Sequence, residues 1–389
     1  MFSHRRFGRV ALLVLAATLL ATHGAHAELS VIRPQQRLPL PPENAPRPTD
    51  PTPFGINFGE FALSDGQTII VTVPQGPAAY AYVKNSTGRW VYHSALVAPP
   101  SGVLLIGGDV RGNVAVLHGF DFAASANTVY VFVRSGGQWT IAQTLPGVPA
   151  SSRVQRLALG PDYLAIGDPG VNDSAGVVHI YDEVTTGQYA FATDLSVAGS
   201  SQGFLFGFQV LADGDTVLTS GAGVQRVGAF ARANGVWTEQ AVLIPDQPLF
   251  DWFFAYSGNR AVLATTGNPQ QFVRRNGSWL KQDFLIHPTD PQRPLFSPIA
   301  MDGRRLLVGE AGSEDALLFE LRDGEWTATA VLRNANDASC PRIAFSGPIK
   351  IAGRLALAAC GNVPAPDPNF EGRVLVYELP PLTQSGDGN

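Results

Sequence analysis

Histidines and cysteines are the side chains of this 389-residue chain whose spacing would reveal a metal or catalytic site. The four histidines beyond residue 27 stand far apart, at His93, His118, His179 and His287. Zinc sites of the HExxH kind need two histidines one helical turn apart, so this spacing predicts no zinc site. The phosphate-binding pattern GxxxxGK[ST] is also missing. We therefore expect no metal and no cofactor.

Acidic residues outnumber basic residues, 32 to 27, which leaves a net charge of −5. Nucleic-acid binding depends on cationic side chains that neutralise phosphates, so we expect no nucleic-acid partner. Carboxylates from distant parts of the chain can still meet in a folded protein and perform acid–base chemistry. The sequence does not show whether they do.

A repeat of roughly 48 residues runs from Phe54 to the C-terminus, a period typical of propellers and solenoids. Six units carry the pattern Gly-x-aromatic, with the aromatic residue at Trp90, Trp139, Tyr189, Trp237, Trp279 and Trp326. A second aromatic residue precedes each of these, and tight turns such as Asp213-Gly214 separate two alternating apolar runs. Val, Ile, Phe, Tyr and Thr at a period of two indicate four short strands in each unit.

Seven such units predict an all-β fold, a seven-bladed β-propeller of four-stranded antiparallel blades. A β-sandwich is the alternative, but it would not produce seven near-equal units. The last unit, which contains Tyr377, lacks a fourth strand. Because Leu29–Ile32 resembles the fourth-strand ends of other units, we expect it to be the outer strand of that blade and to close the ring. The propeller then spans residues 54–389, and residues 28–53 are the closing strand and a Pro-rich linker outside the core.

Aromatic residues cluster where one unit leads into the next, and Phe250, Asp251 and Trp252 form the most prominent group. One interpretation is that these side chains fill the gaps between blades. The other is an exposed binding rim on the face that carries the loops between blades. We take Phe250, Asp251 and Trp252 as the candidate binding residues.

Both cysteines of the chain, Cys340 and Cys360, lie in the last unit. Cys340 precedes the innermost strand and Cys360 ends the next one, so strand direction places both at the same end of that blade. Export to an oxidising compartment would favour a disulfide between them. Two buried free thiols are the alternative.

The unit pattern resembles the FG-GAP repeats of integrin α-subunit-like propellers, especially their exported bacterial forms. The residues that carry the resemblance include Phe58-Gly59, Phe206-Gly207, Asp213-Gly214-Asp215 and Val129-Tyr130-Val131-Phe132. It covers residues 54–379. Family members often hold calcium in Asp-x-Asp-x-Asp-Gly loops. The nearest segment here, from Asp168 to Ser174, lacks the alternating carboxylates, so we expect no calcium.

Residues 1–27 have the features of a secretory signal peptide: three arginines, an apolar run over Val10–Ala21, and the small-x-small site Ala25-His26-Ala27. The apolar run is too short to span a bilayer comfortably, although an N-terminal membrane anchor is the alternative. We expect the mature protein to be a secreted or periplasmic monomer that does not insert into a membrane.

The resemblance implies a non-enzymatic interaction or adhesion module that binds an extracellular or periplasmic protein or glycan. The alternative is an exported hydrolase or lyase with a carboxylate site in the axial funnel of the propeller. A carboxyl group with a strongly displaced pKa at the axis would favour the hydrolase or lyase, and exposed aromatic residues on one rim would favour the binding module.

Overall fold

The alternating runs of β-branched and aromatic residues form strands throughout the computed structural model, in which only one short helix, α1 (Val171–Ser174), interrupts the described strands. The structure describes residues 29–42, 44–46, 58–59, 61–73, 78–99, 103–121, 126–146, 156–310, 315–333, 349–360 and 372–382. No helix among these residues is long and apolar enough to cross a membrane.

Each of the first four blades is a four-stranded antiparallel sheet. Their strands are, blade by blade, β3 (Phe61–Ser64), β4 (Thr68–Thr72), β5 (Ala78–Lys84) and β6 (Trp90–Val97); β7 (Val103–Arg111), β8 (Val114–Asp121), β9 (Ala126–Ser135) and β10 (Gln138–Pro146); β11 (Leu157–Leu159), β12 (Tyr163–Asp168), β13 (Val177–Thr185) and β14 (Gln188–Leu195); β15 (Phe206–Asp213), β16 (Thr216–Gly221), β17 (Val227–Ala233) and β18 (Val236–Leu243).

The remaining three blades follow the same order from the axis outward, and two short N-terminal strands join the last two blades. Their strands are β19 (Leu249–Ser257), β20 (Arg260–Thr265), β21 (Gln270–Arg275) and β22 (Ser278–Phe284); β23 (Leu295–Asp302), β24 (Arg305–Glu310), β25 (Ala316–Arg322) and β26 (Glu325–Leu332) with β1 (Ser30–Ile32); and β27 (Ile349–Ala352), β28 (Leu355–Cys360) and β29 (Arg373–Glu378) with β2 (Gln36–Arg37).

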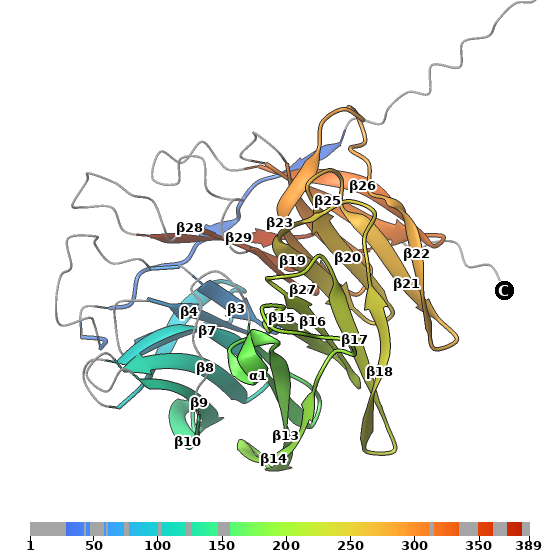
Figure 1. The fold of residues 1–389 in the computed structure, drawn as a ribbon. Helices are drawn as coiled ribbons and strands as arrows, with labels where there is room; N and C mark the ends of the chain where they lie inside the picture. The colour runs from blue at the N-terminus through green and yellow to red at the C-terminus, as the bar shows by residue number, and fades with distance from the viewer. Residues whose placement is uncertain are drawn as a thin grey trace, which may run out of the picture.

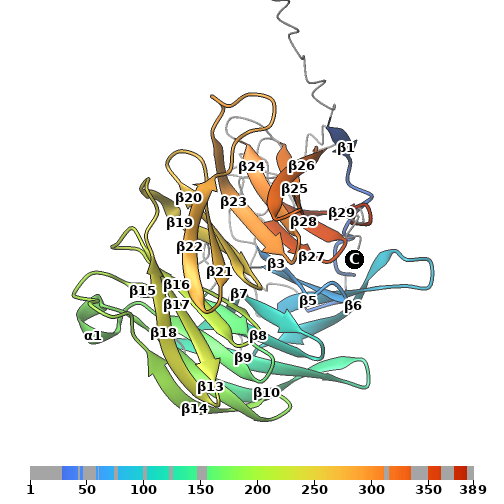
Figure 2. The same cartoon turned by 90° about the vertical axis from the view of Figure 1, so that its right-hand side faces the viewer.

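The seven blades follow one another around a central axis (Figure 1). The innermost strand of each blade contacts the innermost strand of the next, in the order β3, β7, β11, β15, β19, β23, β27 and back to β3. Figure 2 shows this arrangement with the first and last blades side by side. The described buried apolar residues form seven clusters, and each cluster lies between two neighbouring blades. The prediction of a seven-bladed propeller is confirmed.

The turns between strands explain part of the repeat pattern. The third and fourth strands of blade 4 are joined at Asn234 and Gly235, both of which have positive φ angles, +51° and +77°. Two consecutive positive φ angles define the tight hairpin turn that Asn-Gly favours. The turns between first and second strands tie neighbouring blades together. Asp65 Oδ2 accepts a hydrogen bond from the Gly112 N–H at 2.7 Å, and Asp213 Oδ2 accepts one from the Gly258 N–H at 2.7 Å.

The aromatic residues of the Gly-x-aromatic pattern pack at the seams between blades. The Trp237 ring of blade 4 lies edge-on to Tyr163 of blade 3, with 5.0 Å between the ring centroids. The Arg232 guanidinium stacks over both rings, 5.1 Å from Tyr163 and 5.6 Å from Trp237. The pattern therefore recurs because each unit presents an aromatic ring to its neighbour.

The ring has two faces. The upper face carries the connections between blades and those between second and third strands. The lower face carries the turns between first and second strands and between third and fourth strands.

The strand that completes the last blade differs from the expected one. β1 pairs in parallel with β26 and is a fifth strand of blade 6, while β2 pairs antiparallel with β29 and is the outer strand of blade 7. Leu29–Ile32 is therefore the wrong segment, although the N-terminal part of the chain does close the ring. Pro34 has no N–H to donate, so it ends the pairing on blade 6 before the chain reaches blade 7.

Side-chain hydrogen bonds explain why Gln36 takes the closing position. Its Nε2 donates to the Trp90 carbonyl at 2.6 Å, and its Oε1 accepts from the Trp90 N–H at 2.9 Å. Gln143 makes the same two bonds to Tyr189 between blades 2 and 3. β2 therefore occupies the position of a regular fourth strand, and Gln36 links blade 7 to blade 1.

The expectation that the Pro-rich segment lies outside the core is also wrong for its described part. Leu38 and Ala45 are buried in the apolar cluster between blades 7 and 1. The Tyr82 hydroxyl donates to the Pro39 carbonyl at 2.8 Å, and the Tyr80 hydroxyl donates to the Pro46 carbonyl at 2.5 Å. Buried tyrosines need a partner for their hydroxyl groups, and the Pro-rich segment supplies it.

Candidate functional site

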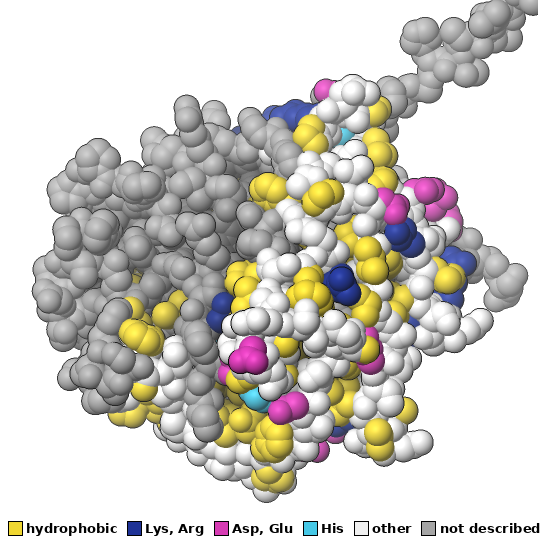
Figure 3. All heavy atoms as spheres, viewed as in Figure 1, with side chains coloured by type: hydrophobic (Ala, Val, Ile, Leu, Met, Phe, Trp, Pro, Cys, Tyr) yellow, Lys and Arg dark blue, Asp and Glu magenta, His cyan; other side chains and the backbone are white. Residues whose placement is uncertain are grey.

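Five polar side chains form a row at the upper end of the seam between blades 2 and 3. His118 comes from β8, Arg156 precedes β11, Asp168 ends β12, His179 lies on β13 and Asp194 lies on β14. We call these five residues the polar row. Figure 3 shows acidic side chains and a histidine side chain together on the surface in the region that α1 occupies in Figure 1.

The outer part of the polar row is a histidine between two carboxylates. His179 Nδ1 lies 2.6 Å from Asp194 Oδ1, and His179 Nε2 lies 3.7 Å from Asp168 Oδ2. The pairing follows from strand register, because His179 lies directly opposite Asp194 on the neighbouring strand. Asp168 Oδ1 also accepts the Gly170 N–H at 2.9 Å. Both histidine nitrogens therefore face negative charge, which favours the imidazolium form.

The pKa values of this group shift in opposite directions. The contact with His179 is the main cause of the lowered pKa of Asp168, and the Gly170 N–H and the Arg156 charge lower it further. The Asp168 carboxylate in turn is the main cause of the raised pKa of His179, with a further contribution from Asp194. Both shifts favour the charged forms of His179 and Asp168, so the pair stays ionised over a wider pH range than the isolated side chains would.

A pH-dependent contribution to stability follows from these shifts. A histidine with a raised pKa in the folded state adds stability that is complete below its ordinary pKa of 6.5 and is lost as the pH rises through the raised value. We expect His179→Gln to destabilise the protein most between about pH 5 and 6.5, and less above that range. Denaturant unfolding of both proteins at several pH values measures the difference.

His93→Gln is the matched control, because burial lowers the pKa of His93. That histidine is held neutral, so its burial loses stability as the pH falls below 6.5. The difference between His93→Gln and the unsubstituted protein should change with pH in the opposite direction. The same pH trend in both variants would contradict the assigned role of His179.

The inner part of the polar row is buried. Arg156 is 7% exposed, and its guanidinium lies 5.3 Å from the centroid of the Phe208 ring. His118 is 3% exposed, and neither of its ring nitrogens has a hydrogen-bond partner among the described residues. Burial, with the nearby Arg156 charge, lowers the pKa of His118 to about 3. His118 is therefore a neutral imidazole with hydrogen-bonding capacity to spare.

Aromatic rings border the polar row at both ends. At the inner end, the ring is that of half-buried Phe208, which lies against the Arg156 guanidinium. On the outer strand, Phe191 is 58% exposed and packs edge-on against Tyr181 at 5.7 Å. Phe191 therefore places an exposed aromatic ring beside the charged pair of His179 and Asp194, with 6.4 Å between the His179 and Phe191 ring centroids.

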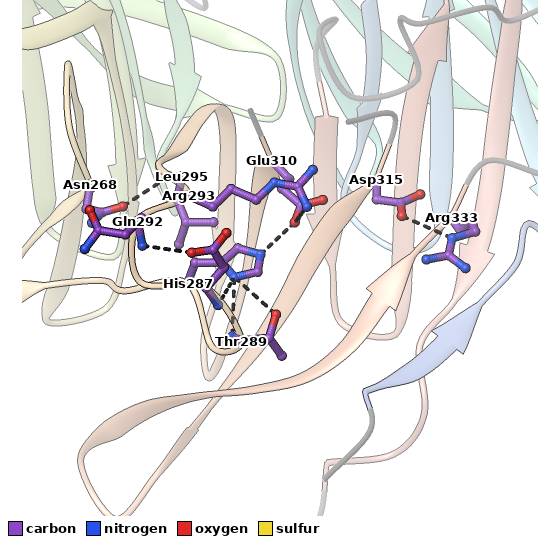
Figure 4. Close-up of polar contacts among 10 residues, drawn as sticks. Asn268, His287, Thr289, Gln292, Arg293, Leu295, Glu310, Asp315 and Arg333 are labelled. Atoms are coloured by element: carbon purple, nitrogen blue, oxygen red, sulfur yellow. Dashed lines mark hydrogen bonds and ion pairs between the residues drawn. The ribbon is translucent and has the colours of Figure 1, made fainter. Parts of the chain in front are cut away.

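A second buried cluster lies on the upper face between blades 5 and 6 (Figure 4). His287 Nε2 lies 2.6 Å from Glu310 Oε1, and Arg293 Nη1 lies 2.9 Å from the same oxygen. His287 Nδ1 accepts the Asp290 N–H at 3.1 Å, so Nε2 carries the proton and donates it to Glu310. His287 is 4% and Glu310 8% exposed. This arrangement fastens the loop between β22 and β23 to the end of β24.

Near the axis, both carboxylate oxygens of Asp109 already have hydrogen-bond partners. Asp109 Oδ2 accepts the Leu159 N–H at 3.0 Å, Asp109 Oδ1 accepts the Val110 N–H at 2.9 Å, and Lys350 Nζ lies 4.0 Å from Oδ1. These contacts link blades 2, 3 and 7. The two aspartates with displaced pKa values, Asp168 and Asp246, both have lowered values, which keeps them ionised at neutral pH.

The residues predicted from the sequence are only partly described. Phe250, Asp251 and Trp252 lie on β19, the innermost strand of blade 5; Phe250 is half-buried, and the side chains of Asp251 and Trp252 lie outside the described set. Cys360 ends β28, whereas Cys340 lies outside the described residues. The binding role of the β19 residues and the disulfide both stay predictions.

The segment Gly199–Gly203 has the spacing GxSxG, which is found at the nucleophile elbow of α/β-hydrolases. That elbow needs a strand followed by a helix. Here Ser201 lies exposed in the loop between β14 and β15, and its carbonyl accepts the Phe204 N–H at 3.1 Å. The local structure therefore does not fit a nucleophile elbow.

Metal-binding clusters are absent from the described residues: no group of three or more histidine, cysteine, aspartate and glutamate side chains is placed to hold a metal ion. In the segment that most nearly resembles a calcium loop, Asp168 turns toward His179 and Gly170, as described above. The absence of calcium stays a prediction.

Comparison with known proteins supports the propeller fold but identifies no family and no activity. No family model and no curated protein matches the chain. A chain of the mitotic checkpoint complex is similar, with 11% identity, coverage of 96% of this chain and 99% of that one, and a TM-score of 0.55. A protein from Lactobacillus plantarum has 14% identity, 70% and 85% coverage, and a TM-score of 0.50. A periplasmic gluconolactonase from Pseudomonas aeruginosa has 17% identity, 70% and 84% coverage, and a TM-score of 0.48. At these identities the likeness concerns the propeller fold alone.

Proposed function

We propose that the chain is an exported binding module, and that the polar row with its bordering aromatic rings recognises a glycan. The single observation that carries this proposal is the polar row itself. It brings donors, acceptors and an unpartnered buried imidazole to one seam of the upper face. Export of the protein and its similarity to FG-GAP propellers remain expectations from the sequence.

The chemistry of the row suits hydroxyl groups. A sugar hydroxyl both donates and accepts hydrogen bonds, and so needs acceptors such as Asp194 beside donors such as Arg156. Neutral His118 offers one donor and one acceptor. Exposed Phe191 and half-buried Phe208 provide apolar ring surface. Because His179 is held between two carboxylates, much of the site is ordered before a ligand arrives, which lowers the entropic cost of binding.

The test is binding of the purified protein to an array of glycans, followed by titration of the strongest hit. We expect Phe191→Ala to weaken binding about tenfold, as truncation of an exposed aromatic anchor does. Asp194→Asn should also weaken it. Val236→Ala is the matched control, because Val236 is a similarly exposed apolar residue on the outer strand of blade 4. Binding that all three variants retain, or an array without any hit, would contradict the proposal.

Hydrolysis is the second candidate function, and the observation that favours it is Glu310. This carboxylate is mostly buried and contacts both a histidine and an arginine, which are groups that acid–base catalysis uses. A panel of lactones, esters and glycosides tests it. Turnover that disappears in Glu310→Gln, with an unchanged melting temperature, would replace the binding proposal; the binding proposal expects no turnover.

A further inference from the structure

A pocket of about 240 Å³ opens on the lower side of the seam between blades 7 and 1. We call it the seam pocket. Its polar lining consists of Gln35, Gln36, Lys84, Arg89, Arg354 and Glu378. It lies on the opposite face from the polar row, so a ligand of the seam pocket would bind independently of the proposed glycan site.

The topology of ring closure explains why a pocket exists here. In the other six blades, a hairpin turn joins the third strand to the fourth. In blade 7 these two strands come from opposite ends of the chain, because β29 ends at Glu378 and β2 begins at Gln36. No turn covers this position. The Glu378 N–H donates to Gln35 Oε1, and both residues line the seam pocket where the turn would be.

The charge of the seam pocket is positive in a chain whose net charge is negative. On the blade 7 side, Arg354 Nη2 lies 3.3 Å from Glu378 Oε1, so these two charges offset each other. On the blade 1 side, neither Lys84 nor Arg89 has an ion-pair partner among the described residues. Lys84 Nζ instead lies 5.4 Å from the centroid of the Trp90 ring, which holds the ammonium group at the pocket wall.

We propose that the seam pocket binds a small anion through its carboxylate or phosphate oxygens. Arg89 presents a planar guanidinium that suits two oxygens at once, and Lys84 adds a compact charge beside it. The volume accommodates a small molecule and not a folded partner.

Binding there also bears on ring closure. The cationic wall belongs to blade 1, whereas Gln36 begins the strand that completes blade 7 and Gln35 directly precedes it. An anion that contacts both walls bridges the first and last blades. Because such a ligand binds only the closed ring, it stabilises the folded protein in proportion to the logarithm of its concentration.

The experiment is calorimetric titration of the full chain with two probes, inorganic phosphate and citrate, at constant ionic strength. We expect one site, with Arg89→Gln weakening the affinity roughly tenfold and Lys84→Gln weakening it less, because a bidentate charged contact is the stronger one. Tighter binding of phosphate or of citrate identifies which oxyanion the site prefers. Added chloride should weaken binding, because the cations are exposed.

Arg275→Gln is the matched control, because Arg275 is an exposed arginine beside the corresponding hairpin turn of blade 5. It should leave the affinity unchanged. Hydrogen exchange supplies a second measurement: the Leu38 N–H, which bonds to the Val374 carbonyl at 3.0 Å, should exchange more slowly with the probe bound. Absence of binding for both probes, or equal losses in Arg275→Gln and Arg89→Gln, would overturn the proposal.

Discussion

Gly207→Ala is expected to lower the melting temperature by roughly 3 to 5 °C, corresponding to about 2 to 4 kcal/mol of lost stability in a protein of this size. Gly207 has a φ of +87°, where an L-residue costs about 1 to 2 kcal/mol. A Cβ at this position would also lie 2.4 Å from the Val177 carbonyl oxygen and 2.7 Å from the Asp168 nitrogen. Both are backbone atoms of blade 3, so neither can move aside cheaply, and forced overlap adds about 1 to 3 kcal/mol.

Gly235→Ala separates the two causes. Gly235 has a comparable φ of +77°, but a Cβ there would meet no atom within 4 Å. For Gly235→Ala, we expect a loss of stability from backbone strain alone. About 0.4 to 1 kcal/mol of that loss is offset, because alanine reduces the conformational entropy of the unfolded chain. Thermal unfolding of both variants measures the contrast. Equal losses would show that the contact between blades 3 and 4 is not the reason for the glycine.

The same argument applies to the first unit. Gly59 has a φ of +93°, and a Cβ there would lie 2.9 Å from the carbonyl oxygen of Arg373 in blade 7. The preceding Phe58 and Phe206 are each 1% exposed. The Phe-Gly pair of the repeat thus has a physical meaning: the phenylalanine fills the seam, and the glycine lets the neighbouring backbone approach.

This meaning explains why the fold could be predicted from the sequence. The markers of the repeat are the residues that make contacts between neighbouring blades, such as Trp237 against Tyr163 and Asp65 on Gly112. Contacts between the turns of neighbouring blades occur at several seams, such as Asp213 on Gly258 and Ser257 on Gly303, so their residues recur along the chain. A fold whose stability depends on equivalent seams leaves its architecture in the spacing of the sequence.

The polar row could not be predicted in the same way, because it occurs at only one seam. His118 and His179 looked isolated in the sequence, because the polar residues near them in the fold are distant along the chain or lie on another strand. The pair formed by His179 and Asp194 depends on register, and a bulge between Ile180 and Tyr181 shifts that register. Alternation alone does not locate a bulge. A histidine and an aspartate on consecutive predicted strands were the available signal.

Ring closure was misassigned for a related reason. The assignment rested on the resemblance of Leu29–Ile32 to the fourth-strand ends of other units, and the apolar residues of that segment also favour a strand more than Gln36 and Arg37 do. The deciding feature is that the Gln36 side chain matches both backbone groups of Trp90, 54 residues away. Strand propensity carries no information about such a contact.

Truncation from the N-terminus should therefore have a stepwise effect. A chain that begins at Pro34 lacks only β1, a fifth strand on the outer edge of blade 6, and should melt within a few degrees of the longer protein. A chain that begins at Pro39 also lacks β2 and Leu38. Leu38 is 2% exposed, and loss of such a side chain costs about 2 to 5 kcal/mol. The two Gln36 bonds add about 1 kcal/mol each.

The summed losses from Leu38 and the two Gln36 hydrogen bonds are comparable with the free energy of unfolding of many proteins, about 5 to 15 kcal/mol. The chain that begins at Pro39 should therefore lose cooperative unfolding or have a much lower melting temperature. Circular dichroism melts of both truncations measure the step. Equal melting temperatures for the two truncations would contradict the assignment of β2 as the closing strand.

Point variants test the closing contact without removing any chain. Gln36→Ala and Gln143→Ala each delete two equivalent side-chain to backbone bonds, one at the closing seam and one between blades 2 and 3. Each should cost about 1 to 3 kcal/mol. Only Gln36→Ala should also speed hydrogen exchange at Leu38. In this variant, β2 loses side-chain bonds that hold it to blade 1 across the seam. In Gln143→Ala, blades 2 and 3 stay joined by the continuous chain, so the N-terminal strand is not affected. Faster exchange at Leu38 in both variants would mean that general destabilisation, and not opening of the ring, exposes the N-terminal strand.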